Sequence, residues 1–180
     1  KISKGKQQSY LKDEAELDSF FIQVALENAE LHINDQAPAI AAEPLGQMVS
    51  EYKAVMAMVE RLSKLYPPMI LKRLIDEPAL TEEMLTQESA VAEWCKNLQA
   101  FFTDEHKAGS EAYTISVRED KERNLFLPNV EIVSHGITHE HRFNHDFFQS
   151  SEYRAVVQLG KKTSGLIEER GYVQRGDKQE

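Results

Sequence analysis

The strongest constraint on the fold is a change in hydrophobic period near residue 110. Before that point apolar residues recur at steps of three and four, the spacing of one face of an α-helix. After it, YTISV at 113–117, LFLPNVEIVSH at 125–135 and ITHEHRF at 137–143 alternate as strands do, with Gly136 placed for a hairpin turn. Segregated helices and strands predict an α+β fold: a small helical lobe followed by an antiparallel sheet with a closing helix.

The helical lobe is predicted over about 45–109, and its first helix has a long apolar stripe that Pro67 and Pro68 end. Residues 35–44, with two prolines, are predicted to be a connector that precedes this helix. Met58 does not lie on the stripe and is therefore expected at the surface, whereas Met48 and Met56 are expected to fill the core. The stripe consists of Leu45, Met48, Val49, Tyr52, Met56, Val59, Leu62 and Tyr66.

Two more helices complete the lobe, one over about Met69 to Ile75 and one over about Gln87 to His106, with Gly109 as the terminator. The inner side of the last helix is predicted to be Val91, Trp94, Cys95, Leu98, Phe101 and Phe102. A lone cysteine in the middle of a helix, with no histidine nearby in sequence, is expected to be buried and unreactive.

The two ends of the chain are predicted from shorter signals. Short strands at Lys1–Ile2 and Tyr10–Leu11 flank a Gly5 turn, and Asp13 with Glu16 forms a capping box that begins a helix. The apolar face of that helix is Leu17, Phe20, Phe21, Val24 and Leu26, and the strand AELHIN follows. After the sheet, a β-rich part of about 110–150, Ser151 is expected to cap the closing helix of about 151–169.

Charge restricts how the chain could meet nucleic acid. The formal net charge is −9, and residues 13–134 hold 23 acids against 10 bases, so the surface as a whole is no platform for phosphates. Residues 1–12, however, carry four lysines and no acid. Lys4, Gly5 and Lys6 are the candidate DNA-binding residues, because a glycine turn flanked by two ammonium groups lets a phosphate backbone approach closely. Ordinary solubilising charge is the alternative explanation of these lysines.

Four of the six histidines, His135, His139, His141 and His145, share parity within HGITHEHRFNH. A straight strand would place all four rings on one face but would spread the outer two over about 33 Å, too far for one ion. A bend at Gly136 or at Asn144 would destroy the alignment altogether. Solvated hairpin histidines with no metal are predicted, and an independent metal-binding module is the alternative.

No catalytic residue is predicted in this chain. It has no phosphate-binding glycine loop, no nucleophile elbow and no HExxH helix, and the acid pairs Glu82–Glu83 and Glu168–Glu169 are explained by exposed helix faces. One cysteine, no long apolar run and no signal-peptide pattern predict a cytoplasmic protein without a membrane partner. The opening KISKGK lacks an initiator methionine, so a piece of a larger protein is expected.

The opening string ISKGKQQSYLKDEAELDSF resembles the late part of the TOPRIM domain of bacterial DNA gyrase B subunits. The rest of the chain is similar to the large insertion that the Gram-negative members of that family carry. The matching phrases are ALENAELHIN, APAIAAEPL, MVSEY, RLSKLYPPMILKRLI, NLFLPNVEIVSHG, SSEYRAVVQLGKKTSGLIEE and YVQRG. The resemblance thus covers essentially the whole chain.

The resemblance implies three segments: 1–27 from the TOPRIM core, 28–170 as the insertion, and 171–180 leading back toward TOPRIM. It also implies a parent enzyme that uses ATP and Mg²⁺ to supercoil DNA negatively, as an A2B2 assembly with the gyrase A subunit. The acids that hold Mg²⁺, the ATP site and the tyrosine that attacks DNA are all expected outside this chain, so no cofactor is expected here. The expected partners are gyrase A, the rest of the B subunit and, through the parent complex, DNA.

Overall fold

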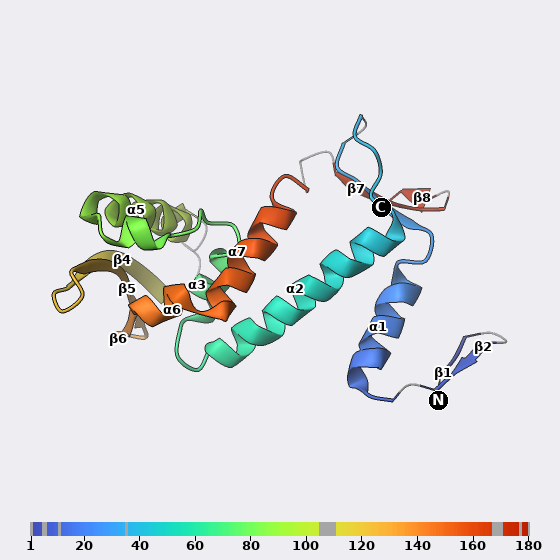
Figure 1. Ribbon diagram of the computed structural model, residues 1–180, viewed down its shortest axis with the longest axis horizontal. Coiled ribbons are helices and arrows are strands. Elements are labelled where there is room, and N and C mark those ends of the chain that lie inside the picture. Colours follow the sequence, from blue (N-terminus) through green and yellow to red (C-terminus); the bar gives the residue numbers. More distant parts are fainter. Residues whose placement is uncertain are drawn as a thin grey trace. The chain divides into compact units, whose positions relative to one another are not determined.

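The computed structural model describes residues 2–4, 7–10, 12–34, 36–104, 111–166, 171–176 and 178–179, and confirms the α+β class (Figure 1). In β1, β2 and β8 only the backbone is described. The chain divides into two compact units. Unit 1 comprises residues 1–54 and 163–180, and unit 2 comprises residues 55–162.

Unit 1 contains two small antiparallel sheets and the helix α1 (Glu14–Ala25). Strands β1 (Ile2–Lys4) and β2 (Gln7–Ser9) form one sheet. The other has the order β3 (Ala29–His32), β7 (Tyr172–Arg175) and β8 (Lys178–Gln179). Ala29 pairs with Arg175, so segments almost 150 residues apart in sequence lie side by side.

The capping box predicted at the start of α1 is present. The Asp13 side chain accepts a hydrogen bond from the Glu16 amide at 2.9 Å, which satisfies one of the free amides of the first turn. The Glu16 carboxylate accepts in return from the Lys12 amide at 2.8 Å. This return bond falls one residue before the cap, a small departure from the usual pattern.

Unit 2 begins at Val55, within helix α2 (Ala42–Leu62). Its other helices are α3 (Pro68–Arg73), α4 (Glu82–Leu85), α5 (Glu88–Asp104), α6 (His145–Gln149) and α7 (Ser151–Thr163), the last up to Lys162. Among the described helices, none combines the length and hydropathy needed to cross a bilayer.

The sheet of unit 2 is antiparallel in the order β4 (Glu111–Asp120), β5 (Leu125–Ser134) and β6 (Ile137–Arg142). His135 and Gly136 join β5 to β6 with φ of 51° and 80°. Positive φ at both central residues is the requirement of a type I′ hairpin turn, and this confirms the predicted turn. Helix α5 packs against β4 and β5.

The hydrophobic core lies in unit 2. Leu85, Val91, Leu98, Leu127 and Val130 have no exposed surface, and three aromatic side chains of the β6–α6 region pack closely with them. The rings of Phe143 and Phe147 meet edge to face with centroids 4.9 Å apart, and Tyr66 stacks on Phe143 at 4.7 Å. The inner side predicted for α5 is confirmed, with Phe101 partly buried and the rest buried.

The prediction for α2 is wrong in three respects. Pro44 belongs to the first turn of the helix, where its missing amide hydrogen would have no partner in any case. The helix ends at Leu62, before the two prolines. Met58 is buried, 8% exposed, whereas Tyr52 of the predicted stripe is 50% exposed. Every position of 54–59 is apolar, so periodicity alone could not select the buried side.

Further differences concern short elements. The first two strands lie at Ile2–Lys4 and Gln7–Ser9 and exclude Tyr10. Helices α4 and α6 were not predicted, because four or five residues give too little period to detect. The hydroxyl of Ser150, and not that of Ser151, accepts from the amide of Tyr153 at the start of α7. The helix ends at Thr163, and Gly165 follows with a φ of 74°.

Candidate functional site

The candidate DNA-binding residues lie at the margin of what the structure describes. Gly5 and Lys6 are outside the described residues, and for Lys4 only the backbone is described, paired with Gln7. The predicted phosphate contact therefore stays a prediction. The predicted helix end at Gly109 and the acid pair Glu168–Glu169 also lie outside the described residues.

The histidine-rich stretch bends at both positions where a bend would separate the rings. His135 is in the hairpin turn, while His145 is the first residue of α6, with Asn144 as its cap. His145 lies 3.7 Å from a carboxylate oxygen of Glu82 and 3.6 Å from one of Asp146. In the part of the chain that the structure describes, no group of three or more histidine, cysteine, aspartate or glutamate side chains could hold a metal ion.

Neither of the other reactive groups lies in a catalytic arrangement. Glu82 and Glu83 are exposed in the first turn of α4, where carboxylates favour the helix dipole. Cys95 is 3% exposed, its thiol lies 3.6 Å from the Ser116 carbonyl oxygen, and burial raises its pKa to about 12. A thiol that stays protonated at neutral pH is a poor nucleophile.

A charged cluster occupies one face of the sheet in unit 2. Glu131 on β5 lies directly opposite Glu140 on β6, an unfavourable pairing of like charges. The Arg142 guanidinium bonds the Glu140 carboxylate at 2.7 Å and holds the pKa of that carboxyl below its usual range. Asn129, only 6% exposed, has a side-chain oxygen that no described residue hydrogen-bonds.

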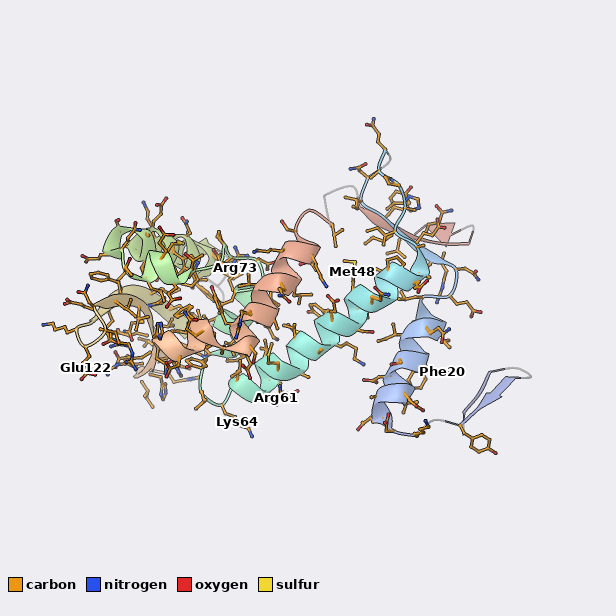
Figure 2. The ribbon with its side chains drawn as sticks, viewed as in Figure 1. Phe20, Met48, Arg61, Lys64, Arg73 and Glu122 are labelled. Atoms are coloured by element: carbon orange, nitrogen blue, oxygen red, sulfur yellow. The ribbon has the colours of Figure 1, made fainter. Side chains whose placement is uncertain are left out.

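An open groove of about 760 Å³ lies in unit 1 along α1 and the first part of α2. Ile22, Leu26, Ala42 and Gly46 form much of its apolar lining. On one side the Lys53 ammonium bonds Asp18 at 2.6 Å and links the two helices. Phe20 on α1 and Met48 on α2, both labelled in Figure 2, belong to the same pair of helices.

Unit 1 shows no hydrophobic core among the residues whose side chains are described. Among its residues with described side chains, Ala29 alone is buried, and α1 has no buried residue. Phe21, on the predicted apolar face of α1, is 55% exposed. Sequence reasoning missed the groove, because a helical apolar face looks the same whether or not a partner covers it. The like-charge pair on the sheet could have been found only with the strand register.

These features define an α+β protein with a well-packed hydrophobic core in unit 2 and no catalytic arrangement among the described residues. Residues 29–180 match the family model of the DNA gyrase B subunit insert domain, and the chain belongs to that family. DNA gyrase is a type II topoisomerase, so the parent of this domain is an enzyme of that class.

Proposed function

We propose that this chain is a non-catalytic accessory part of a gyrase B subunit, which braces the TOPRIM cleavage domain and influences DNA binding and coupling to gyrase A. The observation that carries the proposal is the unequal distribution of the core. Unit 2 contains every buried apolar side chain of the described residues except Ala29. Unit 2 can be a stable body, whereas unit 1 needs a neighbour to cover its apolar surface.

The start of the proposed insertion lies beside the residues that follow its end. Ala29 pairs with Arg175 and His32 with Tyr172, and the rings of the latter two stack with centroids 4.6 Å apart. The Gly176 amide also donates to the Asn28 carbonyl at 3.2 Å. Adjacent ends are the geometry that a host domain tolerates in an insertion, because its own chain is interrupted only locally. This supports the assignment of 1–27 to the host domain, whereas residues 171–180 fall within the family match and their strand β7 pairs with β3.

Charge supports a bracing role through protein contacts. With 23 acids against 10 bases, residues 13–134 as a whole are repelled by a phosphate backbone. Gyrase A and the rest of the B subunit are therefore the partners, and DNA is met through the A2B2 complex. Among the described residues, no group of three or more histidine, cysteine, aspartate or glutamate side chains fits a magnesium ion. We therefore assign the ATP and Mg²⁺ chemistry of the parent enzyme to its other domains.

The test is removal of residues 28–170 from the parent B subunit, with a short flexible linker in their place. The removal takes β3 and leaves β7, whose four paired positions separate Glu27 from Gly171 by about 15 Å, a span that a flexible linker of about ten residues covers. Supercoiling and DNA-stimulated ATP turnover should fall by more than basal ATP turnover does. Unchanged supercoiling would refute the proposed role.

Two controls make the result interpretable. Basal ATP turnover and the circular dichroism spectrum of the shortened subunit report whether it still folds. Glu122→Lys in the intact subunit changes an exposed residue at the tip of the β4–β5 hairpin (Figure 2). This control substitution should leave supercoiling unchanged. Crosslinking of the intact chain to gyrase A then asks whether residues of unit 2 are captured.

A further inference from the structure

The two margins of the sheet in unit 2 differ in how their backbone groups are satisfied. On β4, the side-chain amide of Gln99 donates to the Tyr113 carbonyl at 3.0 Å and accepts from the Ile115 amide at 2.7 Å. The Gln99 amide thus makes the two bonds that a neighbouring strand would make. Covering an edge in this way protects a sheet against pairing with another chain.

The margin at β6 has no such cover among the described residues. Along β5, which is paired on both sides, the backbone N–H and C=O groups of successive residues point alternately toward β4 and toward β6. The Phe143 amide donates to the Pro128 carbonyl at 3.2 Å. The backbone groups of 139, 141 and 143 therefore point toward β5, and those of Thr138, Glu140 and Arg142 point outward. Asn144 continues in extended conformation, so this margin is straight enough to accept a strand.

We propose that β6 pairs antiparallel with β6 of a second copy of this chain, about a two-fold axis through His141. Glu140 of each copy then lies directly opposite Arg142 of the other. Each of these two pairs exchanges both backbone hydrogen bonds, because Glu140 and Arg142 both point outward. The contact is isologous, as a two-fold dimer requires.

Charge complementarity selects this register over its neighbours. A shift of one copy by two residues in either direction places Glu140 opposite Glu140 or Arg142 opposite Arg142, which repels. A larger shift that centres the axis on His139 pairs Glu140 with Thr138 and gains no ion pair. The register centred on His141 is thus the one that forms two opposite-charge pairs across the junction.

The same register relieves the like-charge contact within each copy. Glu131 and Glu140 lie side by side in the isolated chain. In the dimer the row continues from Glu140 to Arg142 of the second copy, so each Glu140 has guanidinium groups on two sides. The row across the junction then runs from Glu131 and Glu140 of one copy to Arg142 and Asn129 of the other, so acidic and basic side chains meet at the two-fold axis.

Sedimentation equilibrium of the whole chain between about 10 µM and 1 mM tests the association, since this range covers the affinity expected of a small interface. A reversible monomer–dimer equilibrium is expected. Glu140→Arg and Arg142→Glu should each weaken dimerisation by at least about tenfold, because two attractive pairs become repulsive. The double variant Glu140→Arg/Arg142→Glu should restore it. A monomer throughout, or no rescue by the double variant, overturns the proposal.

Crosslinking tests the register. In the proposed dimer the two His141 residues form a non-hydrogen-bonded pair with Cα atoms about 4.5 Å apart, within disulfide range. His141→Cys should therefore crosslink readily on mild oxidation. His139→Cys, on the same face of the same strand, should not, and the buried Cys95 should not compete. Faster crosslinking at 139 than at 141 would refute the proposed register.

Discussion

At the scale of single residues, Gly160 on α7 determines how closely that helix approaches the end of α3. A Cβ at this position would lie 1.9 Å from the backbone oxygen of Ile75, so the helix would have to move. Gly160→Ala should therefore lower the free energy of unfolding by about 1–3 kcal/mol, despite the better helix propensity of alanine. Urea unfolding followed by circular dichroism measures the change.

Gly46 on α2 is the matched control. A Cβ there would lie 3.6 Å from a methyl carbon of Leu26, an ordinary contact distance. Gly46→Ala should leave stability unchanged or raise it by up to about 1 kcal/mol, because it removes backbone freedom from the unfolded chain. Equal losses in both variants would show that the close approach at Gly160 is not the cause.

The pKa of Cys95 predicts how stability depends on alkaline pH. Burial raises that pKa from about 9 to about 12, and the pKa values of Tyr113 and Tyr153 are likewise raised to about 12. From pH 9 to 12 the unfolded chain therefore loses protons that the folded chain retains, so stability falls as pH rises.

Cys95→Ala isolates the thiol's share of this effect. The variant should be less stable near neutral pH because it leaves a small cavity, yet it should lose less additional stability between about pH 8 and 10.5. Urea unfolding at the two pH values gives both slopes. If the free energy of unfolding falls equally with pH in the variant and in the unchanged chain, the thiol is not protected in the folded state.

At the scale of elements, the cover that Gln99 gives to β4 can be tested directly. Gln99→Leu keeps the bulk but removes both side-chain hydrogen bonds to the strand, which should cost about 1–3 kcal/mol. The Ile115 amide should also exchange with solvent markedly faster. Asn97→Leu, at an exposed position of the same helix, should change neither. Unaltered exchange at Ile115 would contradict the assignment.

The helical spacing of apolar residues predicted α5, and their alternation predicted the three strands of unit 2. Each of these patterns is long and is bounded by polar or glycine residues. The same reasoning misjudged α2, where Val55 and Met58 are buried while Tyr52 is exposed. Between 54 and 59 every residue is apolar, so the neighbouring elements, and not the local pattern, decide which side is covered. The cap at Asp13 was found because Glu16 completes its pattern, whereas the cap of α7 was placed at Ser151 and is Ser150.

At the scale of the whole molecule, residues 42–163 should fold without the rest of the chain. This segment keeps α2 intact and includes the whole buried core of unit 2. It should show a cooperative unfolding transition close to that of the whole chain. Calorimetry of the two proteins makes the comparison. A segment that melts without cooperativity would show that unit 1 contributes to the core after all.

Less of the candidate site than of the fold could be predicted from the sequence. The bends that separate His135 from His145 were foreseen as possibilities, because glycine and asparagine mark them. The side-by-side placement of Glu131 and Glu140 could not be foreseen, since it depends on a register set by the His135–Gly136 turn. The exposure of α1 could not be predicted either, because the spacing of apolar residues does not show whether another element covers that face.

The Gln99 amide at the outer margin of β4 has a consequence for any assembly that forms through β6. A strand cannot be added where a side chain already occupies the backbone groups of Tyr113 and Ile115. Two joined sheets would therefore have a blocked margin at each end. Assembly through strand pairing therefore stops at the dimer. The Gln99 side chain prevents the open-ended filament that an uncovered sheet edge would otherwise allow.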